Sequence, residues 1–130
     1  MADPKIYTVG WICAITAEYI TAQAFLDEHH ARPESLPPQN KNDYTLGRIG
    51  RHNVVICVLP LGEYGISSAA RVTENILHSF PNVRIGLIIG IGGGAPSPQN
   101  DIRLSDVVVG IPHNDRSEVI QYDFGKMIQG

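Results

Sequence analysis

The first part of the chain alternates between a short apolar run and a stretch with helical spacing. The run from Ile6 to Ile12 is rich in β-forming residues and predicts a first strand. Thr16 is a suitable N-cap residue, and Ala17 to His30 carries apolar residues at positions 20, 24, 25 and 26, which predicts a helix. Residues 31–43 are polar and proline-rich, so we expect a surface loop there.

The middle of the chain predicts a hairpin and a second helix. Tyr44 to Ile49 and Asn53 to Leu59 are strand-like runs separated by Gly50-Arg51-His52, the pattern of a hairpin. Apolar or small residues between Ile66 and Phe80 then recur on one stripe until Pro81-Asn82, which predicts a helix. Ile85 to Ile91 is apolar without alternation, which is typical of a strand covered on both faces.

Two further strand-like runs, Asp106 to Ile111 and Glu118 to Phe124, complete the pattern. Strands that alternate with helices predict an α/β fold with a mixed, mostly parallel sheet and flanking helices. Such sheets bind ligands at the carboxyl ends of their strands, so the segments to search are 12–18, 60–66, 90–96 and 110–116. Only the two helices are predicted, too few to cover a sheet on both faces. We therefore expect residues 1–130 to be the N-terminal portion of a single domain that lacks its C-terminal part, with a partner that covers one face of the sheet as the alternative.

Composition narrows the classes of function. The chain has 130 residues, of which 43% are hydrophobic, and a formal net charge of −3. Its lysines and arginines form no run that could follow a phosphate backbone, which argues against nucleic-acid binding. The apolar runs are too short to span a bilayer, and the N-terminus lacks the apolar core of a signal peptide, so we expect no membrane association and a cytoplasmic location.

The two cysteines, Cys13 and Cys57, each lie within an apolar run and show no metal-type spacing. We expect reduced core thiols, with a disulfide as the less favoured alternative. The histidines also show no ligand spacing. His29 and His30 are expected at a helix C-terminus, where a positive charge is favoured, and His113 near a strand end on the surface. The sequence therefore predicts no metal and no cofactor.

The most unusual segment is Gly90-Ile91-Gly92-Gly93-Gly94-Ala95, which formally matches the G-x-G-x-x-A phosphate fingerprint. That fingerprint needs a helix directly after it, and here Pro96-Ser97-Pro98-Gln99 follow, which argues against a dinucleotide site. Two interpretations stay open. The glycines leave a bare backbone against which a ligand can lie, or they form a tight turn that needs positive φ angles.

Three acidic residues are candidates for chemistry. Glu18 lies in the first turn of the first helix, where a carboxylate favours the helix dipole, but it is also placed to act as a general base at the edge of the sheet. Asp101 and Asp106 flank Ile102-Arg103-Leu104-Ser105, and we interpret both as turn-stabilising residues.

With these residues in place, the sequence resembles the nucleoside phosphorylase superfamily, in the form found at the N-terminus of fungal multidomain receptor-like proteins. The superfamily includes purine and uridine phosphorylases and methylthioadenosine/adenosylhomocysteine nucleosidases. Four segments in family order carry the resemblance, and the third is the most specific: Val9 to Glu18, Leu59 to Gly65 leading into Ser67 to Ala70, Gly90 to Pro96 followed by Asp101 to Val109, and Val119 to Lys126.

The resemblance implies cleavage of the N-glycosidic bond of a purine-type nucleoside or nucleotide, with water or phosphate as the nucleophile, by a homo-oligomer that needs no cofactor. It places Glu18 at the position of the residue that acts on the attacking water. It also assigns Gly65, Gly90, Ile91, Gly92 and Gly93 to nucleoside or phosphate binding.

This chain departs from the family pattern in ways that bear on the reaction. Ile91 takes the place of a family Ser or Thr, and Ile88 and Ile89 stand where phosphorylases carry Arg, which favours water over phosphate. The family's base-protonating Asp and ribose-binding Met-Glu segment lie further along than residue 130. Two hypotheses follow: an N-ribosyl hydrolase or phosphorylase domain, or a non-catalytic nucleoside-sensing or assembly module of a larger receptor-like protein.

Overall fold

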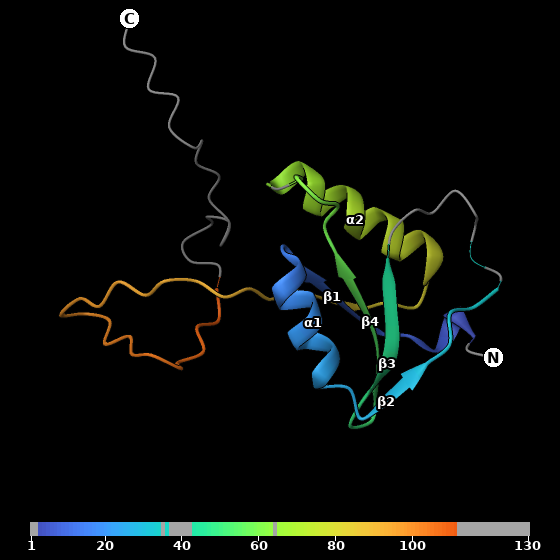
Figure 1. Cartoon of the computed structure of the whole chain (residues 1–130), viewed down its shortest axis with the longest axis horizontal. Helices are drawn as coiled ribbons and strands as arrows, with labels where there is room; N and C mark the ends of the chain where they lie inside the picture. The colour runs from blue at the N-terminus through green and yellow to red at the C-terminus, as the bar shows by residue number, and fades with distance from the viewer. Residues whose placement is uncertain (1–2, 35, 37–42, 64, 112–130) are drawn as a thin grey trace, which may run out of the picture. The chain divides into compact units, whose positions relative to one another are not determined.

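The computed structural model describes residues 3–34, 36, 43–63 and 65–111 (Figure 1). The chain divides into two compact units, Met1–Ile91 and Gly92–Gly130, and each is described by itself. All of the regular secondary structure in the described residues belongs to the first unit. Its elements are η1 (Pro4–Ile6), β1 (Val9–Cys13), α1 (Thr16–Ala24), β2 (Glu28–His30), β3 (Tyr44–Ile49), β4 (His52–Val58), α2 (Ile66–Ser79) and β5 (Ile85–Ile88).

The strands of the first unit form one five-stranded sheet in the order β2-β3-β4-β1-β5. Strand β1 is parallel to both β4 and β5, whereas β3 is antiparallel to both β2 and β4. The α/β class and the mixed sheet are confirmed, but the expected excess of parallel pairing is wrong. The reason is the antiparallel pairing of β2 with β3, which was not expected. It adds to the predicted β3–β4 hairpin, in which a tight turn at Gly50, whose φ is 58°, reverses the chain.

Helices α1 and α2 lie on opposite faces of the sheet (Figure 1). Alternation along the strands divides the buried side chains between these faces, because neighbouring residues of a strand point to opposite sides. On β1, for example, Ile12 belongs to one core cluster and Cys13 to the other. The cluster beside α2 contains Tyr7, Ile12, Leu36, Tyr44, Leu46, Val55, Cys57, Leu59, Val72, Ile76 and Phe80. The cluster beside α1 contains Val9, Cys13, Ala22, Val54 and Ile56.

Helix α1 is shorter than expected and buries a different face. It ends at Ala24, and the expected helical residues 28–30 form β2 instead, paired with β3. Ile20 and Phe25, both expected on the buried stripe, are each 63% exposed, while Glu18 and Ala22 are buried. The prediction for His29 and His30 is therefore wrong, since backbone pairing with β3 outweighs the helical spacing of the side chains.

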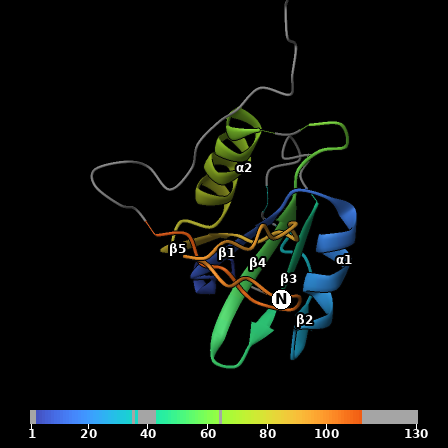
Figure 2. The same cartoon turned by 90° about the vertical axis from the view of Figure 1, so that its left-hand side faces the viewer.

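Strand β5 lies at the edge of the sheet, beside β1 (Figure 2). The prediction that this segment is covered on both faces is wrong, because Ile85 is 52% and Ile88 is 67% exposed. The helices pack mainly on β4 and β1, so the apolar side chains of β5 face solvent. The apolar run correctly predicted a strand but not its burial.

The described residues of the second unit, 92–111, form no helix or strand. The expected strand from Asp106 to Ile111 is therefore wrong, and Val107, Val108 and Val109 are 72–89% exposed. Glu118 to Phe124 and His113 lie outside the described residues. The described part of 31–43 has no regular structure, as expected for a loop, and no helix among the described residues could cross a membrane.

Candidate functional site

The candidate site lies where β1 ends, α1 begins and the chain leaves β5. Glu18 is the third residue of α1, because the N-cap is Ile15 rather than the predicted Thr16. The Glu18 residue is only 9% exposed. A carboxylate with so little contact with water needs hydrogen-bond donors from the protein itself.

Those donors are backbone amides on two different segments. Oε2 of Glu18 accepts from Ala14 N at 3.0 Å and from Ile15 N at 3.4 Å. Oε1 accepts from Ile91 N at 3.0 Å. Oε2 therefore binds the backbone at the start of α1, and Oε1 binds the backbone just after β5. The carboxylate joins these two segments.

Gly90 makes this approach possible. A Cβ atom at Gly90 would stand 3.2 Å from Oε1 of Glu18, and the three nearest heavy atoms would all belong to the Glu18 carboxyl group. None of the glycines at 90–94 has a positive φ. The turn interpretation is therefore wrong, and Gly90 is needed for space rather than for backbone conformation.

The other predicted binding residues are Gly65, in the first unit, and Gly92 and Gly93, in the second. Gly65 is the N-cap of α2, with φ 94° and ψ 176°, a conformation that is essentially restricted to glycine. Its position thus has a sufficient structural explanation. Gly92 and Gly93 belong to the second unit, in which no helix follows the glycine-rich segment within the described residues. The helix that the dinucleotide fingerprint requires thus does not begin within residues 92–111.

The two cysteines are free and buried, as predicted. They lie on neighbouring strands but belong to core clusters on opposite faces of the sheet, so they are not placed to form a disulfide. Burial, together with the nearby charge of Glu18, raises the pKa of the Cys13 thiol to about 11. Burial raises the pKa of the Cys57 thiol to about 12. Neither thiol is a nucleophile at neutral pH.

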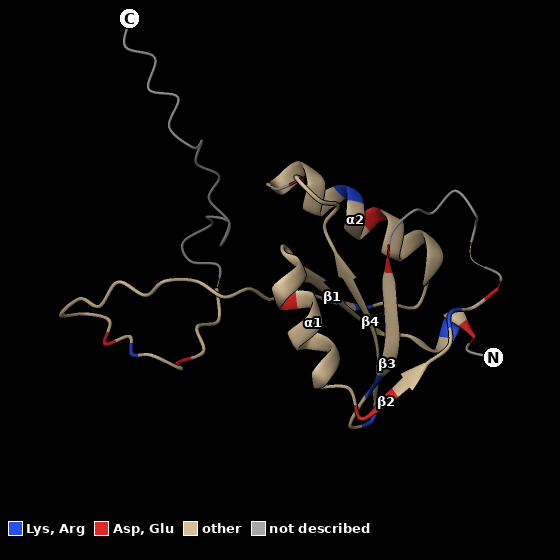
Figure 3. Ribbon diagram, in the orientation of Figure 1, with Lys and Arg blue, Asp and Glu red and all other residues tan. Residues whose placement is uncertain are grey.

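Charged residues are scattered along the ribbon of the described residues (Figure 3), and the lysines and arginines there form no continuous run. No group of three or more His, Cys, Asp or Glu side chains that could hold a metal ion occurs in the described part of the chain.

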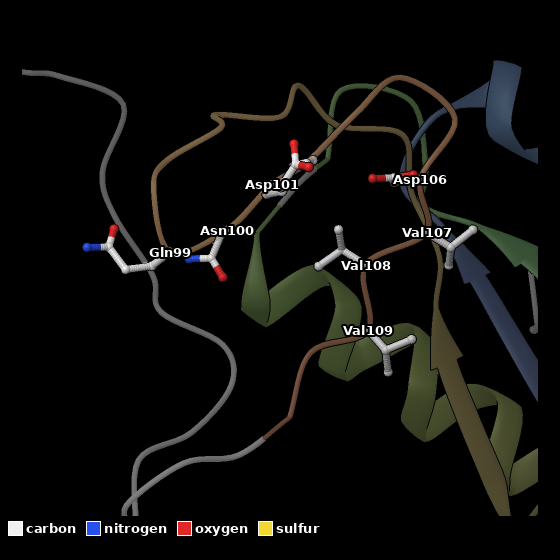
Figure 4. Close-up of a pocket in the computed structure, with 8 residues that line it drawn as sticks. Gln99, Asn100, Asp101, Asp106, Val107, Val108 and Val109 are labelled. Carbon is white, nitrogen blue, oxygen red and sulfur yellow. The ribbon is translucent and has the colours of Figure 1, made fainter.

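The second unit has its own hollow of about 510 Å³ (Figure 4). The Asp106 carboxylate accepts from Arg103 N at 2.8 Å, and Asp101 pairs with the Arg103 guanidinium at 2.8 Å. Asp106 thus stabilises its turn through a backbone N–H, as predicted, whereas Asp101 forms an exposed ion pair. The hollow is lined by Gln99, Asn100, Asp101, Ile102, Asp106, Val107, Val108 and Val109.

Sequence reasoning missed the backbone partners of Glu18. The available signal was the capping pattern, in which an acidic side chain at the third helical position turns back to amides at the N-cap.

Sequence reasoning also missed the indole of Trp11. Its Nε1 is buried without an acceptor among the described residues, and its ring centroid lies 6.5 Å from that of Phe25. No local signal identifies such a pair, because β1 and α1 bring the rings together only in the folded chain.

Comparison with known proteins gives one informative relative. The chain is 50% identical over 127 residues to a nucleotide-binding leucine-rich repeat (NLR)-like protein of the fungus Hyaloscypha variabilis. The match covers 98% of this chain but only 13% of that protein. No family model matches, and no solved structure matches. The similarity agrees with the expected link to multidomain receptor-like proteins, and this chain is similar to one short part of such a protein.

Proposed function

We propose that this chain is a non-catalytic, nucleoside-sensing module of a larger NLR-like receptor. In this proposal the chain has the fold of a nucleoside phosphorylase-like α/β domain. It keeps the site around Glu18 and Gly90 but does not cleave the N-glycosidic bond. The receptor acts in the cytoplasm. The similarity to an NLR-like protein many times longer than this chain supports the receptor context.

The state of Glu18 carries the argument against catalysis. A general base must lie within hydrogen-bond reach of the water whose proton it removes. Here Oε1 and Oε2 of Glu18 together accept three backbone N–H groups and are nearly shielded from water. These bonds fix the position of the carboxylate and hold it away from water. Its arrangement favours a structural role.

The ligand class rests on the resemblance of the glycine-rich segment and its flanks to nucleoside phosphorylases. The bare backbone at Gly90 and the adjoining carboxylate suit a ligand that carries hydroxyl groups, because a hydroxyl can donate to a carboxylate. A ribose fits this description. Phosphate is a poorer fit, since Glu18 would repel it and Ile91 offers no side-chain donor.

An enzyme is the second candidate, and one observation favours it. The structure brings the predicted catalytic residue, Glu18, beside two of the predicted binding residues, Gly90 and Ile91. In an enzyme, the attacking water would have to reach the remaining lone pair of Oε1, which accepts a single bond.

Base release by the full-length protein distinguishes the two candidates. Adenosine, inosine and their nucleotides are incubated with and without phosphate, and the free base is separated by chromatography. We expect no base above the uncatalysed background from the wild type. Release by the wild type that is lost in Glu18→Gln, with both proteins folded, would establish the enzyme and overturn the proposal.

A further inference from the structure

Strand β5 is an edge of the sheet that lacks the usual protection against pairing with another strand. It pairs with β1 on one side, and its other side pairs with no strand in the described part of the chain. Natural sheet edges are usually protected by charged side chains, by proline or by being very short. The opposite edge, β2, follows this rule, since it has three residues and carries Glu28. In contrast, β5 carries neither charge nor proline, and its sequence is Ile85-Gly86-Leu87-Ile88.

The backbone of β5 presents hydrogen-bonding groups at this free edge. The amides of Ile85 and Ile89 donate to carbonyl groups on the β1 side, at 3.2 Å each. Because the N–H and C=O groups alternate in direction along a strand, those of Gly86 and Ile88 point away from β1. These two residues can therefore form a ladder with a further strand.

The side chains on both faces of β5 are apolar and exposed. The register with β1 places Leu87 beside Trp11 on the α1 face and Ile88 beside Ile12 on the α2 face. At Gly86, on the same face as Ile88, a Cβ would meet no heavy atom within 4 Å other than those of its chain neighbours. The strand thus offers a large apolar side chain and, two residues away, an open space on the same face.

We propose that β5 pairs antiparallel with β5 of a second copy of this chain, around a two-fold axis at Leu87. In this register Gly86 and Ile88 of one copy exchange backbone hydrogen bonds with Ile88 and Gly86 of the other. Each Ile88 side chain then lies beside the open space at Gly86 of the other copy.

Charge also favours a second copy as the partner. Arg84, which precedes β5, falls opposite Gly90 of the other copy, so no two like charges face each other across the axis. The edge is therefore self-complementary, as a two-fold interface requires. The pairing joins two five-stranded sheets into one continuous sheet. This inference goes beyond nucleoside sensing and does not depend on it.

Sedimentation velocity of the 130-residue chain, from micromolar to millimolar concentration, tests the pairing. The wild type should become dimeric as its concentration rises. Leu87→Lys places two like charges at the two-fold axis and removes apolar contact, so it should raise the Kd of the dimer at least about tenfold. Leu77→Lys is the matched control, because Leu77 lies on α2 with a similar exposure, 47% against 41%, and should dimerise like the wild type. A wild type that stays monomeric, or a dimer that folded Leu87→Lys leaves intact, would overturn the inference.

Two cysteine variants test the register, and they decide the matter if Leu87→Lys does not fold. Across a non-hydrogen-bonded antiparallel pair, the two Cα atoms at position 87 would lie about 4.5 Å apart, within the range that a disulfide spans. Leu87→Cys should therefore form a cross-linked dimer with oxidised glutathione, since the native cysteines are buried. Ile85→Cys lies on the same face, but its two copies would be roughly 13 Å apart and should not cross-link.

Absence of cross-linking in Leu87→Cys, or equal cross-linking in Ile85→Cys, would overturn the inference. Absence of adenosine binding, in contrast, would overturn the proposed function alone.

Discussion

Replacing Glu18 with glutamine tests the role of its carboxylate, because the change keeps the shape and alters only the hydrogen-bonding groups. A carboxylate has two acceptor oxygens, whereas an amide has one acceptor and a donor. In Glu18→Gln the single oxygen can serve either Ile91 or the Ala14–Ile15 pair, and the NH₂ group must face the remaining N–H donors. One side of the site therefore loses its acceptor.

The expected loss of stability follows from these contacts. A hydrogen bond to a charged acceptor contributes about 1.5–3 kcal/mol. The lost interaction of a negative charge with the helix N-terminus adds about 0.3–1 kcal/mol. Since Glu18 is only 9% exposed, water compensates little, and we expect a total of about 2–4 kcal/mol.

The assay is urea denaturation followed by the fluorescence of Trp11, the single tryptophan. Glu63→Gln is the matched control, because Glu63 forms a surface ion pair with Arg71 and should change stability by at most about 1 kcal/mol. If Glu18→Gln is no less stable than this control, the carboxylate does not hold the site together and the reasoning fails.

Four further outcomes are expected, each from a different part of the molecule. Gly90→Ala should lower the free energy of unfolding by about 1–3 kcal/mol by overpacking against Oε1, and unchanged stability in urea would contradict the close approach. Gly65→Ala should cost about 1–3 kcal/mol because its backbone conformation is essentially restricted to glycine, and a neutral effect on the melting temperature would refute this. Tyr7→Phe removes the 2.7 Å bond to His30 Nδ1 from a fully buried hydroxyl and should cost about 1 kcal/mol in the same urea assay. The buried thiols, with the pKa of Cys57 raised to about 12, should react with a thiol reagent only as fast as the chain opens.

The same thiols make stability depend on alkaline pH. An unfolded thiol ionises near its ordinary pKa of 9.0, but the folded chain keeps the protons to about 11 at Cys13 and about 12 at Cys57. Stability is thus fully present below pH 9 and is lost as pH rises from 9 towards 12. A Cys57→Ala variant should lose less stability than the wild type over this range, and an identical pH profile would refute the assignment.

Local patterns predicted the elements whose formation depends on neighbouring residues. The β3–β4 hairpin and α2 were predicted because residues close together in the sequence determine both the turn at Gly50 and the apolar stripe of α2. The end of α1 could not be predicted in this way. Residues 28–30 leave the helical pattern because Arg48, Gly47 and Leu46 offer backbone partners from another part of the chain.

At the candidate site, too, the sequence predicted local features but not contacts between distant segments. The sequence identified Glu18 and the glycine-rich segment separately, but not that Ile91 N would occupy the carboxylate. That bond joins residues 73 positions apart and depends on β5 lying beside β1. The sequence left a structural and a catalytic role open for Glu18, and the fold adds the bond to Ile91 that favours the structural one.

Equilibrium dialysis of the 130-residue chain against adenosine, followed by chromatography of the retained ligand, tests the central claim most directly. A non-catalytic nucleoside sensor with Glu18 held by backbone amides should retain adenosine and return it intact. Recovery of free adenine, or no retention of adenosine by the folded chain, would contradict the account.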